Sequence, residues 1–159
     1  MAEQTPALSA SEAFQLAQDA AQAMWSRDHV AKALGMSLEE VKPGYARLSM
    51  VIRQDMVNGH AICHGGMLFT LADTAFAYSC NSYNQNTVAS SAHIDFLAPS
   101  HIFDMLVAEA TERSLGGRTG VYDVTISTRT DAGEMKTVAL FRGKSARIKG
   151  EVTASLSQA

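Results

Sequence analysis

The stretch from Asn58 to Asn81, NGHAICHGGMLFTLADTAFAYSCN, combines two histidines, a thiol and a Gly-Gly pair with an apolar run that carries one acid, Asp73. Moving an ionised carboxylate into an apolar interior costs several kcal/mol even after relaxation. The side chain of Asp73 therefore either lies at a solvent-exposed edge, pairs with a buried basic residue, or borders a cleft. In a cleft, apolar neighbours would set its pKa and orientation for work as a base or nucleophile.

Gly65-Gly66 stands directly before the apolar run, where a helix would begin. The first N–H groups of a helix have no partner within it, and the helix dipole adds roughly half a positive charge there. Glycine also lets another molecule approach the backbone closely. Such N–H groups suit a carbonyl oxygen that gains negative charge during acyl transfer. The alternative is an ordinary N-terminal turn without a ligand, and Gly-Gly alone does not decide between the two.

The spacing of these groups constrains how they could act together. Gly65 and Asp73 are eight residues apart in the sequence, which is about 12 Å along one helix. The short side chain of Asp73 cannot reach an atom that the Gly65 N–H also holds. If both serve one carbonyl, they come from two copies of the chain, so an enzyme of this kind is at least a dimer with its site at the subunit interface.

Two other arrangements in the same stretch could carry chemistry. His60 and His64 have the i, i+4 spacing of metal ligands, but they precede the helix, where that spacing does not put them on one face. Cys63 next to His64 could form a thiolate pair. Adjacent side chains usually point apart, however, and buried structural thiols are commoner than nucleophilic ones. We therefore expect no metal site and no catalytic cysteine.

The spacing of hydrophobic residues predicts the helices that position these residues. The segment from Gly65 to about Ser82 is apolar nearly all round, which is typical of a helix buried at the centre of a domain. At the N-terminus, Ser9 and Glu12 form a capping box at the start of a helix with one apolar stripe. We expect that helix to end near Gly35.

The remaining periodic segments predict strands. The expected strands cover residues 45–53, 88–98, 103–114, a segment around Tyr122, Val124 and Ile126, and 136–148. In the last of these, Val138, Leu140 and Ala146 are expected to share one face. The predicted order is α-β-α-β-β-β-β, which indicates an α+β fold: a mainly antiparallel sheet with one apolar helix on it, preceded by an N-terminal helix.

Length, composition and charge limit the kinds of protein that this chain can be. The 159 residues fit a single domain, with its core at about residues 12–150 and tails at 1–8 and 150–159. A net charge of −3 gives no general attraction to nucleic acid or to an acidic membrane. The first residues lack the basic and apolar regions of a secretion signal, and no apolar stretch is long enough to span a bilayer. We therefore expect a cytoplasmic protein that binds neither nucleic acid nor membrane.

Three stretches together identify a resemblance: NGHAICHGGMLFTLADTAFAYSCNS (58–82), GVYDV (120–124) and KTVALFRGKSARIKG (136–150). They closely resemble the phenylacetate-degradation thioesterase family, a group of hotdog-fold acyl-CoA thioesterases, over roughly residues 12–150. The resemblance implies a long central helix wrapped by a curved antiparallel sheet. It also implies subunits that pair into dimers and commonly into homotetramers, and hydrolysis of aryl- or hydroxyphenylacetyl-CoA to free acid and CoA without a cofactor.

The resemblance also implies catalytic roles for four residues of this chain. Asp73 matches the catalytic carboxylate, which acts as nucleophile or as general base on water. Gly65 matches the backbone N–H that polarises the thioester carbonyl from the partner subunit. Asn58 and His64 match residues that help to orient the water, the carbonyl or the loop.

Four further residues are candidate substrate contacts. Some relatives carry a hydroxyl residue where this chain has Ala77, and Thr74 is the nearest replacement for positioning water. Gly66 shares the helix start with its neighbour, and the ring of Phe76 could border the acyl pocket. Lys144, on a strand rich in basic residues, could meet the nucleotide phosphates of CoA.

Two other functions remain possible for the same architecture. An enoyl-CoA hydratase or dehydratase would need a His–acid pair flanking the α and β carbons of the substrate, and His64 could supply the base. A non-catalytic acyl-CoA-binding protein would hold the ligand without cleaving it, although such a binder has no need for the charge of Asp73 in apolar surroundings. Release of free thiol distinguishes hydrolysis from both.

Overall fold

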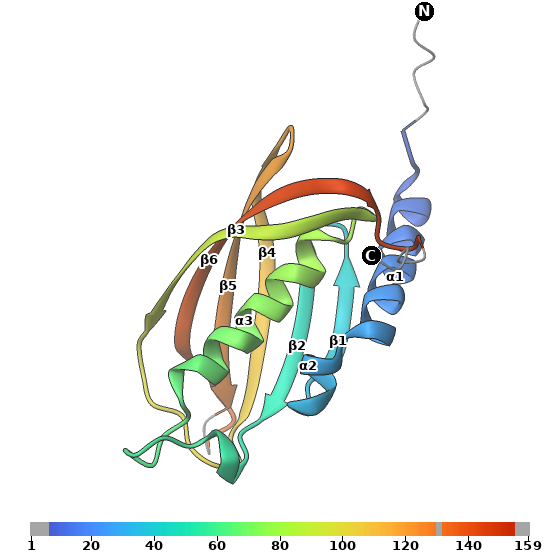
Figure 1. Cartoon of the computed structure of the whole chain (residues 1–159). Helices are drawn as coiled ribbons and strands as arrows, with labels where there is room; N and C mark the ends of the chain where they lie inside the picture. The colour runs from blue at the N-terminus through green and yellow to red at the C-terminus, as the bar shows by residue number, and fades with distance from the viewer. Residues whose placement is uncertain (1–6, 130–131, 155–159) are drawn as a thin grey trace, which may run out of the picture.

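The computed structural model describes residues 7–129 and 132–154, and Figure 1 shows a curved sheet that wraps one long central helix. The helices are α1 (Ala10–Arg27), α2 (His29–Ala33), the short 3-10 helix η1 (Gln54–Met56) and α3 (Gly65–Cys80). The strands are β1 (Ser37–Lys42), β2 (Tyr45–Val51), β3 (Gln85–Phe96), β4 (Met105–Gly116), β5 (Thr119–Arg129) and β6 (Met135–Glu151). They form one antiparallel sheet in the order β1-β2-β4-β5-β6-β3. This is the α+β architecture that the residue patterns predict, in the hotdog arrangement that the family resemblance implies.

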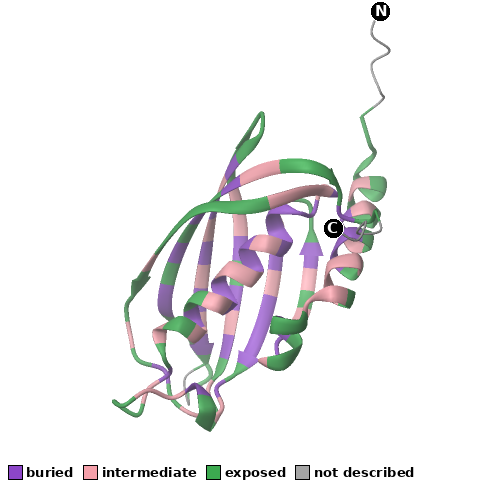
Figure 2. Ribbon diagram, viewed as in Figure 1, coloured by how far each residue is buried: buried purple, intermediate pink, exposed green. Residues whose placement is uncertain are grey.

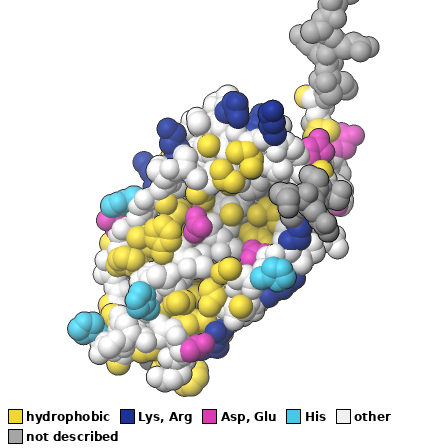
Figure 3. All heavy atoms as spheres, viewed as in Figure 1, with side chains coloured by type: hydrophobic (Ala, Val, Ile, Leu, Met, Phe, Trp, Pro, Cys, Tyr) yellow, Lys and Arg dark blue, Asp and Glu magenta, His cyan; other side chains and the backbone are white. Residues whose placement is uncertain are grey.

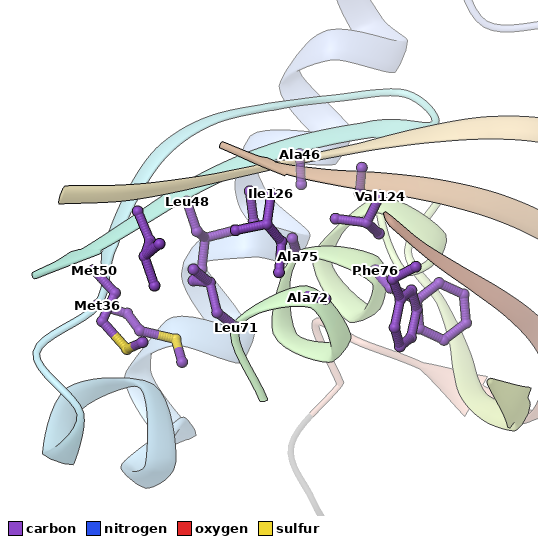
Figure 4. Packing of buried hydrophobic residues seen from close by; sticks show 14 of the residues in the cluster. Met36, Ala46, Leu48, Met50, Leu71, Ala72, Ala75, Phe76, Val124 and Ile126 are labelled. Atoms are coloured by element: carbon purple, nitrogen blue, oxygen red, sulfur yellow. The ribbon is translucent and has the colours of Figure 1, made fainter. Parts of the chain in front are cut away.

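The central helix α3 packs against the concave face of the sheet through one side of buried apolar residues. Leu71, Ala72, Ala75 and Phe76 are at most 1% exposed and face the inward residues of β2 and β5, as Figure 4 shows. Figure 2 shows the same pattern along the ribbon, where buried positions recur on the side of α3 that meets the sheet. The predicted burial of this helix is therefore confirmed for one side, while the opposite side remains partly accessible.

The N-terminal helix begins as predicted but ends earlier. Ser9 accepts from the Glu12 N–H while Glu12 accepts from the Ser9 N–H, which completes the capping box. The expected single helix to Gly35 is wrong, because Asp28 leaves helical geometry (φ −82°, ψ 88°). Its carboxylate accepts the Ala31 N–H and so starts the separate helix α2, in keeping with the preference of Asp for helix N-caps.

Two strand predictions are corrected by the structure, and both corrections trace to irregular pairing. Strand β1 is absent from the predicted order, because a register shift between Leu38 and Glu40 breaks its alternation. In β6, the pairing skips Val138, so Val138 and Ala139 both point inward and the alternation reverses after them. Leu140, expected inside, is 45% exposed, whereas Phe141 is 2% exposed.

The expected tail from residue 150 also begins too early. Strand β6 continues to Glu151, and Val152 is 2% exposed, with its N–H donated to the Asn84 carbonyl. The expected tail at 1–8 falls mostly on residues 1–6, which lie outside the described residues. Among the helices that the structure describes, none has both the length and the hydropathy needed to cross a bilayer.

Strand β3 forms one edge of the sheet and lies alongside α3 in Figure 1. Its inner edge pairs with β6 through Gln85 to Phe96, and no other described strand pairs with its outer edge. Apolar side chains remain accessible on it, with Val88 at 47% and Phe96 at 54% exposed. Figure 3 shows hydrophobic side chains gathered on this face of the molecule, with acidic side chains set singly among them.

Candidate active site

The start of α3 leaves one backbone N–H free. His64 is the N-cap (φ −63°, ψ 132°), and its Nδ1 accepts the Gly66 N–H at 2.9 Å. The Gly65 N–H donates no hydrogen bond to any described residue. Because Nδ1 accepts, the neutral imidazole carries its proton on Nε2, which is then a donor. This corrects the expectation for Gly66: its N–H is occupied by His64 and is not available to a substrate.

Asn58 organises the loop that leads to this helix. Its Oδ1 accepts the N–H groups of His60 at 2.9 Å and Ile62 at 3.4 Å, and its own N–H donates to the Ile62 carbonyl. Ala61 lies in the left-handed region at φ 58°, which the tight turn requires. The side-chain amide N–H groups of Asn58 make no hydrogen bond to the described residues, so they remain available as donors.

A groove of about 470 Å³ opens beside the start of α3. Its lining includes the two predicted site residues Asn58 and Gly65, together with Leu68 and with Phe96 and Leu97 from the end of β3. The loop before α3 and the loop after β3 are joined here, since the Cys63 N–H donates to the Ser100 carbonyl at 2.8 Å. The contribution of β3 is not among the predictions from sequence, although the two large apolar residues directly before Ala98-Pro99 indicate an apolar surface there.

Asp73 lies on the side of α3 that faces away from the sheet. Its side chain makes no ion pair or hydrogen bond with any described residue, which excludes a buried ion pair as the reason for its position. Partial burial raises the pKa of Asp73 above its ordinary value of 3.8. The carboxylate is therefore half-buried, unpaired and more basic than usual, as a general base or nucleophile requires.

Gly65 and Asp73 are the first and ninth residues of the one helix α3. Their backbones are therefore about 12 Å apart, and the groove beside Gly65 does not include Asp73. Within one chain, the structure brings together Asn58, His64 and Gly65 but leaves Asp73 apart from them. A site that uses all four residues needs two chains.

Thr74 and Phe76 do not lie where the sequence placed them. The Thr74 hydroxyl donates to the Thr70 carbonyl at 2.7 Å, so its proton is committed to the helix backbone. Phe76 is 1% exposed, and its ring packs against Tyr122 and Phe141 at centroid distances of 5.5 and 5.9 Å. Phe76 is thus a core residue between α3 and the sheet, not a wall of the groove.

Lys144 lies on the convex face of the sheet. Its neighbour Gly143 faces the ring of Phe76, and side chains alternate along a strand, so Lys144 points away from α3. Arg142, on the same face, donates to both oxygens of Asp123 at 2.6 and 2.9 Å. Lys144 therefore does not join the residues at the start of α3.

The cysteines and histidines form no second chemical centre among the described residues. Burial raises the pKa of the Cys63 thiol, which disfavours the thiolate that a nucleophile needs. Burial raises the pKa of Cys80 to about 12, and Asp73 contributes to that rise. In the part of the chain that the structure describes, no three His, Cys, Asp or Glu side chains gather as metal ligands.

Comparison with known proteins assigns this chain to a family. Residues 60–134, which include the start of α3 and Asp73, match the model of the thioesterase superfamily. The acyl-coenzyme A thioesterase PaaI of Escherichia coli K12 is 50% identical over 133 residues, which cover 84% of this chain and 92% of PaaI.

Solved structures agree with the sequence relatives. The structure of E. coli PaaI, from the phenylacetic acid degradation operon, superposes with a TM-score of 0.81 at 49% identity, over 86% of this chain and 96% of PaaI. A single-residue mutant of the phenylacetic acid degradation protein PaaI of Thermus thermophilus superposes with a TM-score of 0.71 at 35% identity, over 76% of this chain and 100% of that protein. This chain therefore belongs to the thioesterase superfamily and, within it, to the family of PaaI-type acyl-coenzyme A thioesterases.

Proposed function

We propose that the protein hydrolyses aryl acyl-CoA thioesters of the phenylacetyl and hydroxyphenylacetyl type to the free acid and CoA. Asp73 of one copy acts on the substrate, and the Gly65 N–H of a second copy binds its carbonyl oxygen. His64 and Asn58 lie beside that N–H and supply further donors through Nε2 and the side-chain amide. The acyl group is inferred from the operon of the relative in E. coli, which serves phenylacetic acid degradation.

One observation carries this proposal: a half-buried carboxylate and a free helix N-terminal N–H that lie on one helix but too far apart to share a carbonyl. Neither group has a partner among the described residues. An unpaired carboxylate in apolar surroundings is costly for folding alone, so a catalytic use accounts for it better than a structural one.

The two groups suffice for thioester hydrolysis. With Asp73 as general base, its carboxylate takes a proton from water while the oxygen of that water attacks the carbonyl carbon. The carbonyl oxygen gains negative charge, which the Gly65 N–H and the dipole of α3 stabilise. The carbon–sulfur bond then breaks, the proton passes to the leaving sulfur, and the free acid and CoA thiol depart. With Asp73 as nucleophile, an anhydride forms first and water hydrolyses it.

The second copy is proposed to pair along the outer edge of β3. This edge is unpaired in the described chain, and β3 carries the accessible apolar residue Val88, which is 47% exposed. Unpaired edges of this kind readily accept another strand. A twofold axis at β3 would bring the partner's α3 toward the α3 of the first copy, and pairs of dimers would give the expected homotetramer.

Three broader expectations belong to the same proposal. We infer that the whole chain acts as one thioesterase domain, because β1 and β3, at opposite edges of one sheet, share the core around α3. Both cysteines are free, which suits a reducing compartment such as the cytoplasm. The substrate is acyl-CoA, and the acid–base chemistry of Asp73 requires no cofactor.

The test is hydrolysis of phenylacetyl-CoA by the purified full chain, followed by release of free thiol. We expect turnover well above the spontaneous rate, with phenylacetate as the second product. Hydration of an enoyl-CoA without thiol release would indicate a hydratase instead. Tight binding of CoA with neither reaction would indicate a binding protein, and either outcome overturns the proposal.

A further inference from the structure

The end of β3 supplies a residue that the proposed reaction does not use. Phe96 is the last residue of β3, and its ring points at the start of α3. Its Cζ and Cε1 atoms lie 3.0 and 3.2 Å from the position that a Cβ atom on Gly65 would occupy. The ring therefore lies directly beside the start of α3, where the backbone N–H is free to bind a carbonyl oxygen, and any side chain larger than that of glycine at position 65 would require the ring to shift.

The groove that Phe96 borders is uncharged. Its described lining combines the apolar side chains of Ile62, Leu68 and Leu97 with a few small polar residues, and none of them is acidic or basic. The Cys63 thiol in its wall has a raised pKa and stays protonated at neutral pH. A charged acyl group would lose its hydration in this groove without gaining a partner, whereas an apolar group would gain buried surface.

The volume of the groove, about 470 Å³, falls within the range of small-molecule pockets. A thioester whose carbonyl oxygen accepts the Gly65 N–H has its acyl group next to this space. An aromatic acyl group could then meet the Phe96 ring edge-to-face or offset, which adds to the gain from burial alone.

We propose that Phe96 is a specificity residue that selects an uncharged aromatic acyl group in the copy that donates the Gly65 N–H. This inference rests on the proposed function, and it adds that selection and proton transfer belong to different subunits. The acyl group packs against Phe96 of one chain while Asp73 of the other chain performs the chemistry. Ring-to-ring contact favours an aromatic over an aliphatic acyl group about two- to tenfold beyond the effect of area.

The test compares three thioesters with the full chain: phenylacetyl-CoA, butyryl-CoA and the charged succinyl-CoA. We expect wild-type protein to hydrolyse succinyl-CoA least. In Phe96→Ala, the ratio of kcat/KM for phenylacetyl-CoA to that for butyryl-CoA should fall about two- to tenfold, chiefly through KM, and Phe96→Leu should lie between. Phe14→Ala is the matched control, because Phe14 on α1 is 49% exposed and lies outside the groove; its ratio should equal that of wild type.

The possible failures can be told apart. If wild-type protein releases thiol but the ratio stays unchanged in both Phe96 variants, the role of Phe96 is refuted and the thioesterase function stands. If wild-type protein releases thiol from none of the three substrates, the proposed function itself fails. Thermal unfolding identifies a variant that does not fold, and Phe96→Leu, which keeps an apolar side chain, then decides the question.

Discussion

Replacing Asp73 by Asn is expected to abolish thioester hydrolysis while the fold persists. The amide has nearly the shape of the carboxylate but can neither take a proton from water nor attack a carbonyl. A positioned general base contributes about 10²–10⁴ in rate, so kcat for phenylacetyl-CoA should fall by that factor with little change in KM. Thiol release under saturating substrate measures the loss, and gel filtration verifies that the assembly is unchanged.

The same substitution should not destabilise the protein. Partial burial raises the pKa of Asp73 above 3.8, its ordinary value, so the native state binds this proton more tightly than the unfolded state. Between 3.8 and the raised pKa, the wild-type protein therefore loses stability as the pH rises, and above that pKa the full cost of the charge remains. The unfolding free energy of Asp73→Asn, relative to wild type, should be higher at neutral pH than below pH 3.8.

Two results would contradict this account of Asp73. Activity within a few-fold of wild type in Asp73→Asn would remove the residue from the chemistry. Marked destabilisation at neutral pH would show instead that the carboxylate has a structural partner.

Gly65→Pro is expected to cause the second large loss. Proline fits the first position of a helix, and the extended backbone of the preceding His64 (φ −63°, ψ 132°) is the conformation that a residue before proline prefers. The substitution therefore deletes the N–H with little strain on the backbone. Removing one donor to an oxyanion costs about 10²–10³ in kcat, and single-turnover hydrolysis of phenylacetyl-CoA would measure it.

Proline also adds a Cβ atom, which would lie 3.0 Å from the ring of Phe96. Gly65→Ala is the matched control, because it adds the same atom but keeps the N–H. We expect Gly65→Ala to lose far less in kcat than Gly65→Pro, with its main effect on KM as the ring shifts. Equal losses in the two variants would assign the effect to crowding and would deny the N–H its role.

The fold was largely predictable because its main elements are locally consistent. The capping box at Ser9 and the apolar run after Gly65 each depend on neighbouring residues, and both appear in the structure as expected. The errors in the strands arose where the register between paired strands decides which side chains point inward. Val138 is skipped in the pairing of β6 with β5, and the apolar alternation of β6 alone does not reveal this register shift.

Some features of the candidate site could likewise be predicted from the sequence, and others could not. The N–H of Gly65 is free because Gly65 begins α3, and its separation from Asp73 follows from their positions along that helix, so both were predictable. The lack of an ion-pair partner for Asp73 was not, because it depends on which residues fold around α3. The capture of the Gly66 N–H by His64 depends on a side-chain rotamer, and the approach of Phe96 depends on the path of β3. Helical spacing does not tell which side of α3 meets the sheet, so the sequence allows the ring of Phe76 either to lie in the core or to border the acyl pocket, and the structure buries it in the core.

The central claim, that each active site takes its carboxylate and its amide from different chains, can be tested by subunit mixing. Asp73→Asn and Gly65→Pro, each inactive alone, are unfolded, mixed in equal amounts and refolded together. About half of the resulting dimers are mixed and carry one intact site of two, so activity should recover to about one quarter of wild type. Activity that stays at the level of the separate variants, although mixed dimers have formed, would contradict a site shared between two chains.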